Sequence, residues 1–170
     1  MAEPEQPDAD VPVAEHLVDQ LQGAWMSRRR GAFRDICAPD LHWEDPFCAE
    51  PLRGVEELAD HAAQLWEAFP DAKVETAGAR LLGGRYVAAP VKLGGTHLGE
   101  IEGVTATGRY VLVHAVLYCE LDPPGERLWR VRVFLDGYDA AVQIGMLPKR
   151  GSIGERALMV ARGFGLRRWL

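Results

Sequence analysis

The sequence predicts an α+β fold, in which a curved, mostly antiparallel sheet wraps around three N-terminal helices to form a cone. Three segments with helical periodicity precede Pro70, whereas the residues from Ala72 to Leu135 form extended apolar stretches separated by glycine and proline turns. Apolar residues make up 48% of the 170 residues, so the chain can build a sizeable core within one domain.

The three helical segments are predicted from apolar spacing and from their ends. The first carries one apolar face formed by Val13, Leu17, Leu21, Ala24 and Trp25. A second, short helix is expected over 31–38 and is stopped by Pro39, and a strand is expected over 41–47. The third lies between Gly54 and Pro70, and Glu56 and Glu57 stand in its first turn, where the helix dipole favours acidic groups.

The second half of the domain is predicted to be strands followed by one short helix. Turn residues such as Gly83-Gly84 and Thr107-Gly108 separate strands over 73–82, 85–98, 109–121 and 128–135. One or two helical turns are expected over 139–146, and Pro148 closes the domain.

Tails of opposite charge flank this domain, which we place at 11–148. Residues 1–10 are acidic and proline-rich and are expected to be disordered. Residues 149–170 hold six basic residues and one acidic residue, a net charge of +5 that leaves −11 for the rest. Ser152 and Glu155 form a helix capping box there. This extension is expected to be a solvated helix that packs on the domain or on a partner subunit; contact with an anionic membrane is the alternative.

The overall charge and the cysteines exclude several classes of protein. A net charge of −6 argues against nucleic-acid binding. Cys37, Cys48 and Cys119 are widely spaced and form no CxxC pair, so neither a disulfide framework nor a metal site is predicted. The start of the chain lacks the apolar core of a signal peptide, so a soluble cytoplasmic protein is expected.

Three stretches carry the residues of interest. The first is His42-Trp43-Glu44-Asp45-Pro46-Phe47 with the following Leu52-Arg53-Gly54. The second is Gly95-Thr96-His97-Leu98-Gly99-Glu100 with the later turn Thr107-Gly108-Arg109. The third is Val133-Phe134-Leu135-Asp136, which leads to Gln143-Ile144-Gly145.

In their order and spacing these stretches resemble the SnoaL-like polyketide cyclases of the NTF2-like superfamily. The resemblance covers about residues 13–148, and its most specific parts are the Gly-Thr-His-x-Gly strand and the Asp-x6-Gln-x-Gly ending. It implies a cone-shaped α+β fold, a homodimer and a pocket for an apolar small molecule, with acid/base chemistry of the aldol-cyclisation or isomerisation type.

The resemblance also implies that Asp136 is the catalytic acid/base. A carboxylate at the end of the last strand that points into an apolar cone loses hydration, which favours its neutral form and suits proton transfer. Such chemistry needs a base and a pocket that holds the substrate in a reactive conformation, so no cofactor is expected. Phe134 and Arg132 lie on the same strand face as Asp136 and would accompany it inward; Arg132 would hold a substrate oxygen or pair with Asp136. His97 would assist from the Gly-Thr-His-x-Gly strand or act as a hydrogen-bonded strand histidine.

The remaining expectations concern the pocket wall. Expected contacts with the substrate are Trp43, Phe47, Trp66, His114, Tyr118 and Phe134. His114 also suits a core or interface position. His16 and His61 are interpreted as surface residues, and His42 and Asp45 lie three apart on a strand, which argues against a shared metal. Asp45 before Pro46 is expected to cap a loop.

A second class of function stays open. The family's cyclases typically carry a His-Trp-Asn run before the aspartate, where this chain has Val131, Arg132 and Val133. The alternative is therefore a non-catalytic ligand-binding or dimerisation protein. With Asp136 pointing inward, Val131, Val133 and Leu135 would form an outer apolar face that suits a dimer contact.

Overall fold

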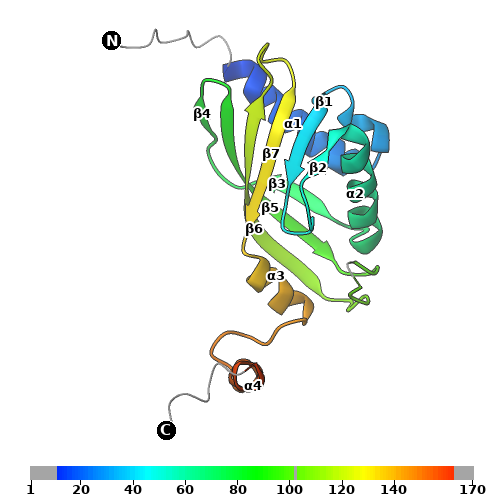
Figure 1. The fold of residues 1–170 in the computed structure, drawn as a ribbon, viewed down its shortest axis with the longest axis vertical. Coiled ribbons are helices and arrows are strands. Elements are labelled where there is room, and N and C mark those ends of the chain that lie inside the picture. Colours follow the sequence, from blue (N-terminus) through cyan, green and yellow to red (C-terminus); the bar gives the residue numbers. More distant parts are fainter. Residues whose placement is uncertain (1–10, 102, 163–170) are drawn as a thin grey trace, which may run out of the picture.

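The computed structural model describes residues 11–101 and 103–162, which form one α+β unit (Figure 1). Its helices are α1 (Val11–Ser27), the 3-10 helix η2 (Arg30–Phe33), α2 (Gly54–Ala68), α3 (Gly137–Ile144) and α4 (Ile153–Ala161). Its strands are β1 (Cys37–Glu44), β2 (Leu52–Arg53), β3 (Lys73–Thr76), β4 (Leu81–Gly83), β5 (Tyr86–Thr96), β6 (Tyr110–Leu121) and β7 (Leu128–Leu135). The acidic segment 1–10 lies outside the described residues.

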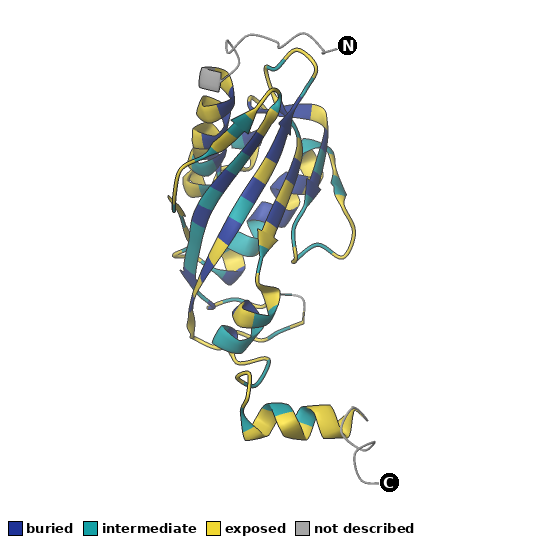
Figure 2. Ribbon diagram, turned by 90° about the vertical axis from the view of Figure 1, so that its left-hand side faces the viewer, coloured by how far each residue is buried: buried dark blue, intermediate teal, exposed yellow. Residues whose placement is uncertain are grey.

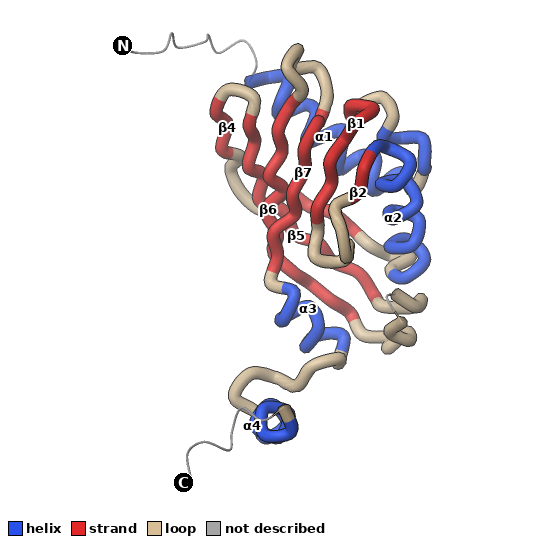
Figure 3. The backbone as a smooth tube through the Cα atoms, in the orientation of Figure 1, coloured by secondary structure: helices blue, strands red, loops and turns tan. Residues whose placement is uncertain are grey.

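The strands form one strongly curved sheet that does not close on itself (Figure 3). Their order is β2-β1-β7-β6-β5-β3, and β4 pairs separately with β5. All pairs are antiparallel except β1 with β7, which makes the sheet mixed. Helices α1 and α2 cover the concave side, and α3 packs on Val111 and Val113 at one end of β6. The predicted cone is confirmed.

The segment between α1 and α2 differs from the expectation. Residues 31–38 were expected to be helical, but only the short η2 forms, and β1 already begins at Cys37. Its pairing with β7 shifts register between Cys37 and His42, so Pro39, which cannot donate to the ladder, sits in a bulge.

The expected strand over 73–82 is divided into β3 and β4. Both halves pair with β5, and the break faces Pro90, whose missing N–H interrupts the ladder. Ala77 bonds the Pro90 carbonyl instead, and Gly78 lies against the proline ring.

Buried and exposed residues alternate along the central strands (Figure 2). On β7, Val131, Val133 and Leu135 face the helices, whereas Arg132 and Phe134 face outward. Arg130 lies on the same outward face. Burying the two charged arginines would cost far more than exposing Phe134, so the valines take the interior. The expectation that Val131, Val133 and Leu135 form an outer face is therefore wrong.

The Gly-Thr-His-x-Gly stretch joins the end of β5 to the end of α2. The Ala68 carbonyl at the helix end accepts from the backbone N–H groups of Leu98 and Gly99, at 2.8 and 3.1 Å. A Cβ added at Gly99 would collide with the backbone carbonyl of Glu67, and one added at Gly95 would lie 3.1 Å from Ala72 Cα. The glycines therefore allow backbone to pack on backbone.

A Gly99→Ala substitution should lower the free energy of unfolding by about 1–3 kcal/mol, because the added methyl forces backbone apart. The matched control is Gly23→Ala in α1, where nothing lies within 4 Å of the added Cβ. That variant should be neutral or stabilised by up to about 1 kcal/mol. Urea unfolding measures both, and an unchanged midpoint for Gly99→Ala would contradict this packing.

Candidate functional site

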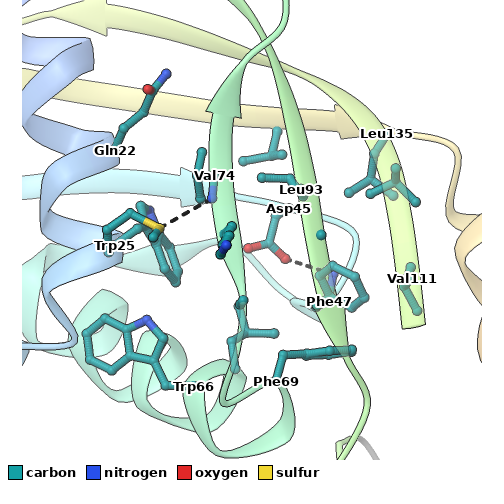
Figure 4. A pocket seen from close by; sticks show the side chains of 18 of the residues that line it. Gln22, Trp25, Asp45, Phe47, Trp66, Phe69, Val74, Leu93, Val111 and Leu135 are labelled. Atoms are coloured by element: carbon teal, nitrogen blue, oxygen red, sulfur yellow. Dashed lines mark hydrogen bonds between the residues drawn. The ribbon is translucent and has the colours of Figure 1, made fainter. Parts of the chain in front are cut away.

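A cavity of about 160 Å³ lies between α1, α2 and the concave side of the sheet (Figure 4). Its wall is almost entirely apolar. The chief side chains are Trp25, Met26, Trp43, Phe47, Leu65, Trp66, Phe69, Val74, Leu93, Val111, Val113, Leu117, Val133 and Leu135. Trp43, Phe47 and Trp66, three of the residues expected to contact a substrate, line this cavity.

Three tryptophans make one part of this wall rigid. The ring of Trp25 on α1 lies 5.7 Å from that of Trp43 on β1 and 6.1 Å from that of Trp66 on α2. Phe33 packs behind Trp25 and Trp66, at 5.4 and 6.2 Å. Helices and sheet are thus joined by aromatic contacts at the cavity, which suits a flat apolar ligand.

Asp45 is the acidic residue of the cavity wall, and its side chain is only 5% exposed. Its Oδ2 atom accepts hydrogen bonds from the Trp43 indole and the His61 ring, each at 2.8 Å, and its Oδ1 atom accepts from the Phe47 backbone at 2.7 Å. The last bond fulfils the loop-capping role predicted for Asp45. Both acceptor sites of Oδ2 are used, so Oδ1 is the oxygen that retains a site for a ligand.

The pKa of Asp45 lies below its usual value of 3.8. Burial of the carboxyl raises the pKa, but the hydrogen bond and charge of His61, followed by the bonds from Trp43 and Phe47, outweigh burial. The carboxyl is therefore ionised at neutral pH although it is enclosed by apolar side chains. Such a carboxylate can accept a proton, above all from a carbon acid that is already fairly acidic.

His61 was expected on the surface and is instead buried on the inner face of α2. Because an ionised Asp45 only accepts, the His61 Nε2 atom must carry the proton of their hydrogen bond. The Cys48 sulfur lies 3.6 Å from Nε2 and 3.9 Å from Nδ1. One donor atom each from Asp45, Cys48 and His61 falls within 4.8 Å of the others, which is close enough for one divalent cation. The predicted absence of a metal stays a prediction.

The sequence held signals for both residues. Asp45 is two residues from Trp43 on a strand, so an inward Trp43 carries Asp45 with it. His61 is three residues from Leu58 and four from Leu65, which places it on the apolar face of α2.

Gln22 of α1 and Lys73 of β3 also belong to the wall. The Oε1 atom of Gln22 accepts from Thr76 at 3.3 Å. Its Nε2 atom is buried and has no hydrogen-bond partner among the described residues. Since a buried donor without a partner is costly, this N–H group is available to a ligand oxygen.

Asp136, the expected catalytic residue, does not point into the cone. Its side chain is 57% exposed and lies beside Arg150, at 3.6 Å. It is the N-cap of α3, where it accepts from the Asp139 backbone N–H at 3.0 Å. Gln143 bonds the backbone of Leu112 on β6, and Gly145 ends α3 with a φ of 88°. The Asp-x6-Gln-x-Gly ending thus holds α3 against the sheet.

The other residues on the face of Asp136 also lie outside the cone. Arg132 pairs with Glu44 at 2.9 Å, and Phe134 is exposed. His114 and Tyr118 stand on the outer face of β6, where Tyr118 stacks on Tyr86 at 6.0 Å. The alternation predicted for these strands is correct, but the side assigned to the interior is reversed, so these residues do not line the cavity.

His97 is fully buried one layer behind the wall. Its ring stacks on Phe69 at 5.3 Å, and Phe69 lines the cavity. Its Nδ1 atom lies 3.2 Å from the Thr107 hydroxyl, whereas Nε2 has no partner among the described residues. The structure therefore favours a hydrogen-bonded strand histidine over a group that contacts a ligand.

The chain belongs to the SnoaL-like polyketide cyclase family, whose model matches residues 15–144. No curated protein matches the chain. Among solved structures it is similar to a proposed SnoaL-like polyketide cyclase from Jannaschia sp. CCS1, with a TM-score of 0.73 and 20% identity over 85% of this chain and 100% of that one.

Two Streptomyces proteins share the fold. IdmH of Streptomyces antibioticus, a proposed polyketide cyclase, has a TM-score of 0.65 and 21% identity over 78% of this chain and 98% of its own. AclR of Streptomyces galilaeus, a proposed hydroxylase, has a TM-score of 0.67 and 19% identity over 88% of this chain and 92% of its own. The different activities proposed for these proteins show that the reaction must be argued from the site.

The hydrogen bonds of Asp45 make stability depend on pH. Since the folded state lowers this pKa, the stabilisation is complete well above pH 3.8 and is lost as the pH falls through the folded value. Asp45→Asn should cost about 1–3 kcal/mol of unfolding free energy at pH 7, because an amide has one acceptor oxygen and cannot accept from Phe47 as well as from His61 and Trp43. This cost should shrink below about pH 4. Urea unfolding from acid to neutral pH tests it; a cost that stays constant would contradict the lowered pKa.

Proposed function

We propose that the protein is a cofactor-independent enzyme that performs acid/base chemistry, aldol-type cyclisation or isomerisation, on an apolar carbonyl compound, with Asp45 as the base. The observation that carries this proposal is one ionised carboxylate, enclosed by aromatic and aliphatic side chains, with an oxygen that can still accept a proton. This role replaces the one expected for Asp136.

The reaction would begin when Asp45 takes a proton from a carbon next to a carbonyl group. The electrons of the C–H bond become an enolate, and Asp45 becomes a carboxylic acid. In a cyclisation, the enolate carbon attacks a second carbonyl of the same molecule, and the new alkoxide recovers the proton from Asp45. In an isomerisation, the proton returns to another carbon. Neither route consumes an oxidant or a reductant.

The low pKa of Asp45 limits the substrate. A weakly basic carboxylate removes a proton efficiently only from an acidic carbon, such as one between two carbonyl groups. The tryptophan-rich wall favours flat, conjugated molecules over polar ones. Gln22 would donate to a substrate oxygen, and His61 would hold Asp45 in position.

Asp45→Asn should lower the rate of proton exchange at the activated carbon of aromatic 1,3-dicarbonyl compounds by at least about 100-fold. The measurement is NMR in D₂O, which detects proton abstraction whatever the final product, with the buffer rate subtracted. The matched control is Asp136→Asn, which keeps its helix cap and lies outside the cavity, and it should exchange at the wild-type rate.

Loss of exchange in Asp136→Asn but not in Asp45→Asn would overturn the assignment of the base. The alternative, a non-catalytic ligand-binding protein, predicts a third result. In that case aromatic dicarbonyls would quench the fluorescence of the cavity tryptophans, while neither the wild-type protein nor the variants would raise the exchange rate above that of buffer.

We also propose that the protein is a homodimer that forms through the outer face of β5, β6 and β7. Support comes from the exposed apolar and aromatic side chains gathered there: Tyr86, Tyr110, Leu112, Tyr118 and Phe134. Exposed patches of this kind on a sheet face suit a self-complementary contact. The family resemblance supports the same partner.

Phe134→Asp should convert the dimer to a monomer, because a carboxylate cannot be buried there without a partner. Light scattering after size exclusion measures the mass. Val13→Asp, an equally polar change at an exposed position of α1, should leave the mass unchanged. A wild-type monomer, or the same mass for both variants, would exclude this interface.

We propose a cytoplasmic location. Support comes from Cys37 and Cys119, which are buried thiols rather than a disulfide in the described structure. Burial raises the pKa of each to about 12, so both thiols stay protonated and unreactive. None of the described helices is long and apolar enough to cross a membrane.

A further inference from the structure

Helix α4 stands apart from the cone (Figures 1 and 2). None of its residues is buried against this chain, and the expected packing on the domain or on a partner subunit stays a prediction. Ser152 caps the helix by accepting from the Glu155 backbone N–H at 3.2 Å. Glu155 in the first turn accepts from the Tyr138 hydroxyl of α3 at 3.1 Å, which joins the start of the helix to the domain. The capping box predicted from the sequence thus starts a helix that the fold itself leaves uncovered.

The helix has an apolar stripe that faces water. Ile153, Ala157 and Val160 recur at helical spacing on one side, and Ile153 and Val160 are 85% and 51% exposed. The half-buried residues of the helix, Glu155 and Leu158, lie on the opposite side. A stripe of this kind calls for a partner that the described residues do not supply.

Positive charge surrounds the stripe. Lys149, Arg150, Arg156 and Arg162 are all exposed on or beside α4. Residues 149–170 carry +5 in all, whereas residues 1–148 carry −11. The sequence after the helix continues with aromatic, aliphatic and basic residues, namely Phe164, Leu166, Arg167, Arg168, Trp169 and Leu170. This separation of charge leaves one end of the molecule suited to an anionic surface.

We propose that residues 149–162, α4 and the basic residues beside it, bind the surface of an anionic membrane, with α4 in the plane of the headgroups. The stripe of Ile153, Ala157 and Val160 would enter the boundary with the acyl chains, and the basic side chains would contact lipid phosphates. A purely acidic protein partner would account for the charge but not for the exposed isoleucine and valine.

The binding should be peripheral and reversible. The apolar stripe is one short helix, and the electrostatic part weakens when salt screens it. The inference does not depend on the proposed chemistry, because the helix lies outside the cavity and contributes no residue to its wall.

The test is co-sedimentation of the full chain with lipid vesicles. Most of the protein should pellet with vesicles of phosphatidylcholine and phosphatidylglycerol at low salt, and little with phosphatidylcholine alone. Raising the salt to about 0.5 M should release it. Two double variants, Ile153→Asp with Val160→Asp and Arg150→Gln with Arg156→Gln, should each lower the bound fraction at least about fivefold.

The matched controls lie on the body of the protein. Val13→Asp repeats the change from valine to aspartate, and Arg29→Gln repeats the loss of an exposed arginine. Both should pellet like wild type. Equal recovery with both kinds of vesicle, or wild-type binding by both double variants, would overturn the proposal. A change in oligomeric mass on α4 substitution, without lipid binding, would assign the stripe to a second copy of the chain and would also overturn it.

Discussion

The site depends on keeping one carboxylate charged inside an apolar cavity. Removing Asp45 from water disfavours its ionised form, and the apolar side chains that line the cavity offer no compensation. The structure compensates with three donors: the indole of Trp43, the ring of His61 and the backbone N–H of Phe47. Each belongs to a different local element, namely β1, α2 and the loop after β1, so the carboxylate also fixes how these elements meet.

The same group sets the relation between stability and chemistry. Donors that hold the pKa of Asp45 low stabilise the fold at neutral pH, but they also weaken the carboxylate as a base. In such a site the carboxylate is a weaker base, but it is ionised at neutral pH. Its efficiency must then come from orientation, which the rigid contacts among Trp25, Trp43 and Trp66 can provide.

Much of the fold could be predicted from the sequence, because the spacing of apolar residues and the positions of turn and capping residues are local features of the chain. Apolar spacing and the positions of glycine, proline and serine predict α2, the strands β5 to β7 and the capping box at Ser152. Errors arose where tertiary pairing overrode the local signal. Cys37 joined a parallel ladder instead of a helix, and Pro90 divided the strand that pairs with it.

The candidate site was harder to predict, because alternation along a strand identifies two faces but not which one is inside. An inward Asp136 implies that Arg132 and Phe134 also point inward and that the opposite face of the strand points outward, where it suits a dimer contact. Both orientations are the reverse of what the structure shows. The cost of burying Arg130 and Arg132 contradicts that choice, and Val131 and Val133 on the other face support the opposite one. His61 and Asp45 were missed for a related reason: each polar residue was considered alone, although their partnership is what makes either suited to the interior.

The most direct test is a carbon-13 NMR titration of the Asp45 carboxyl group, assigned by comparison with Asp45→Asn. Our account predicts that Asp45 titrates below the ordinary 3.8 and that His61→Ala moves its midpoint upward. A midpoint at or above the ordinary value in the wild-type protein would contradict it, since Asp45 would then lack the network that keeps it ionised in the cavity.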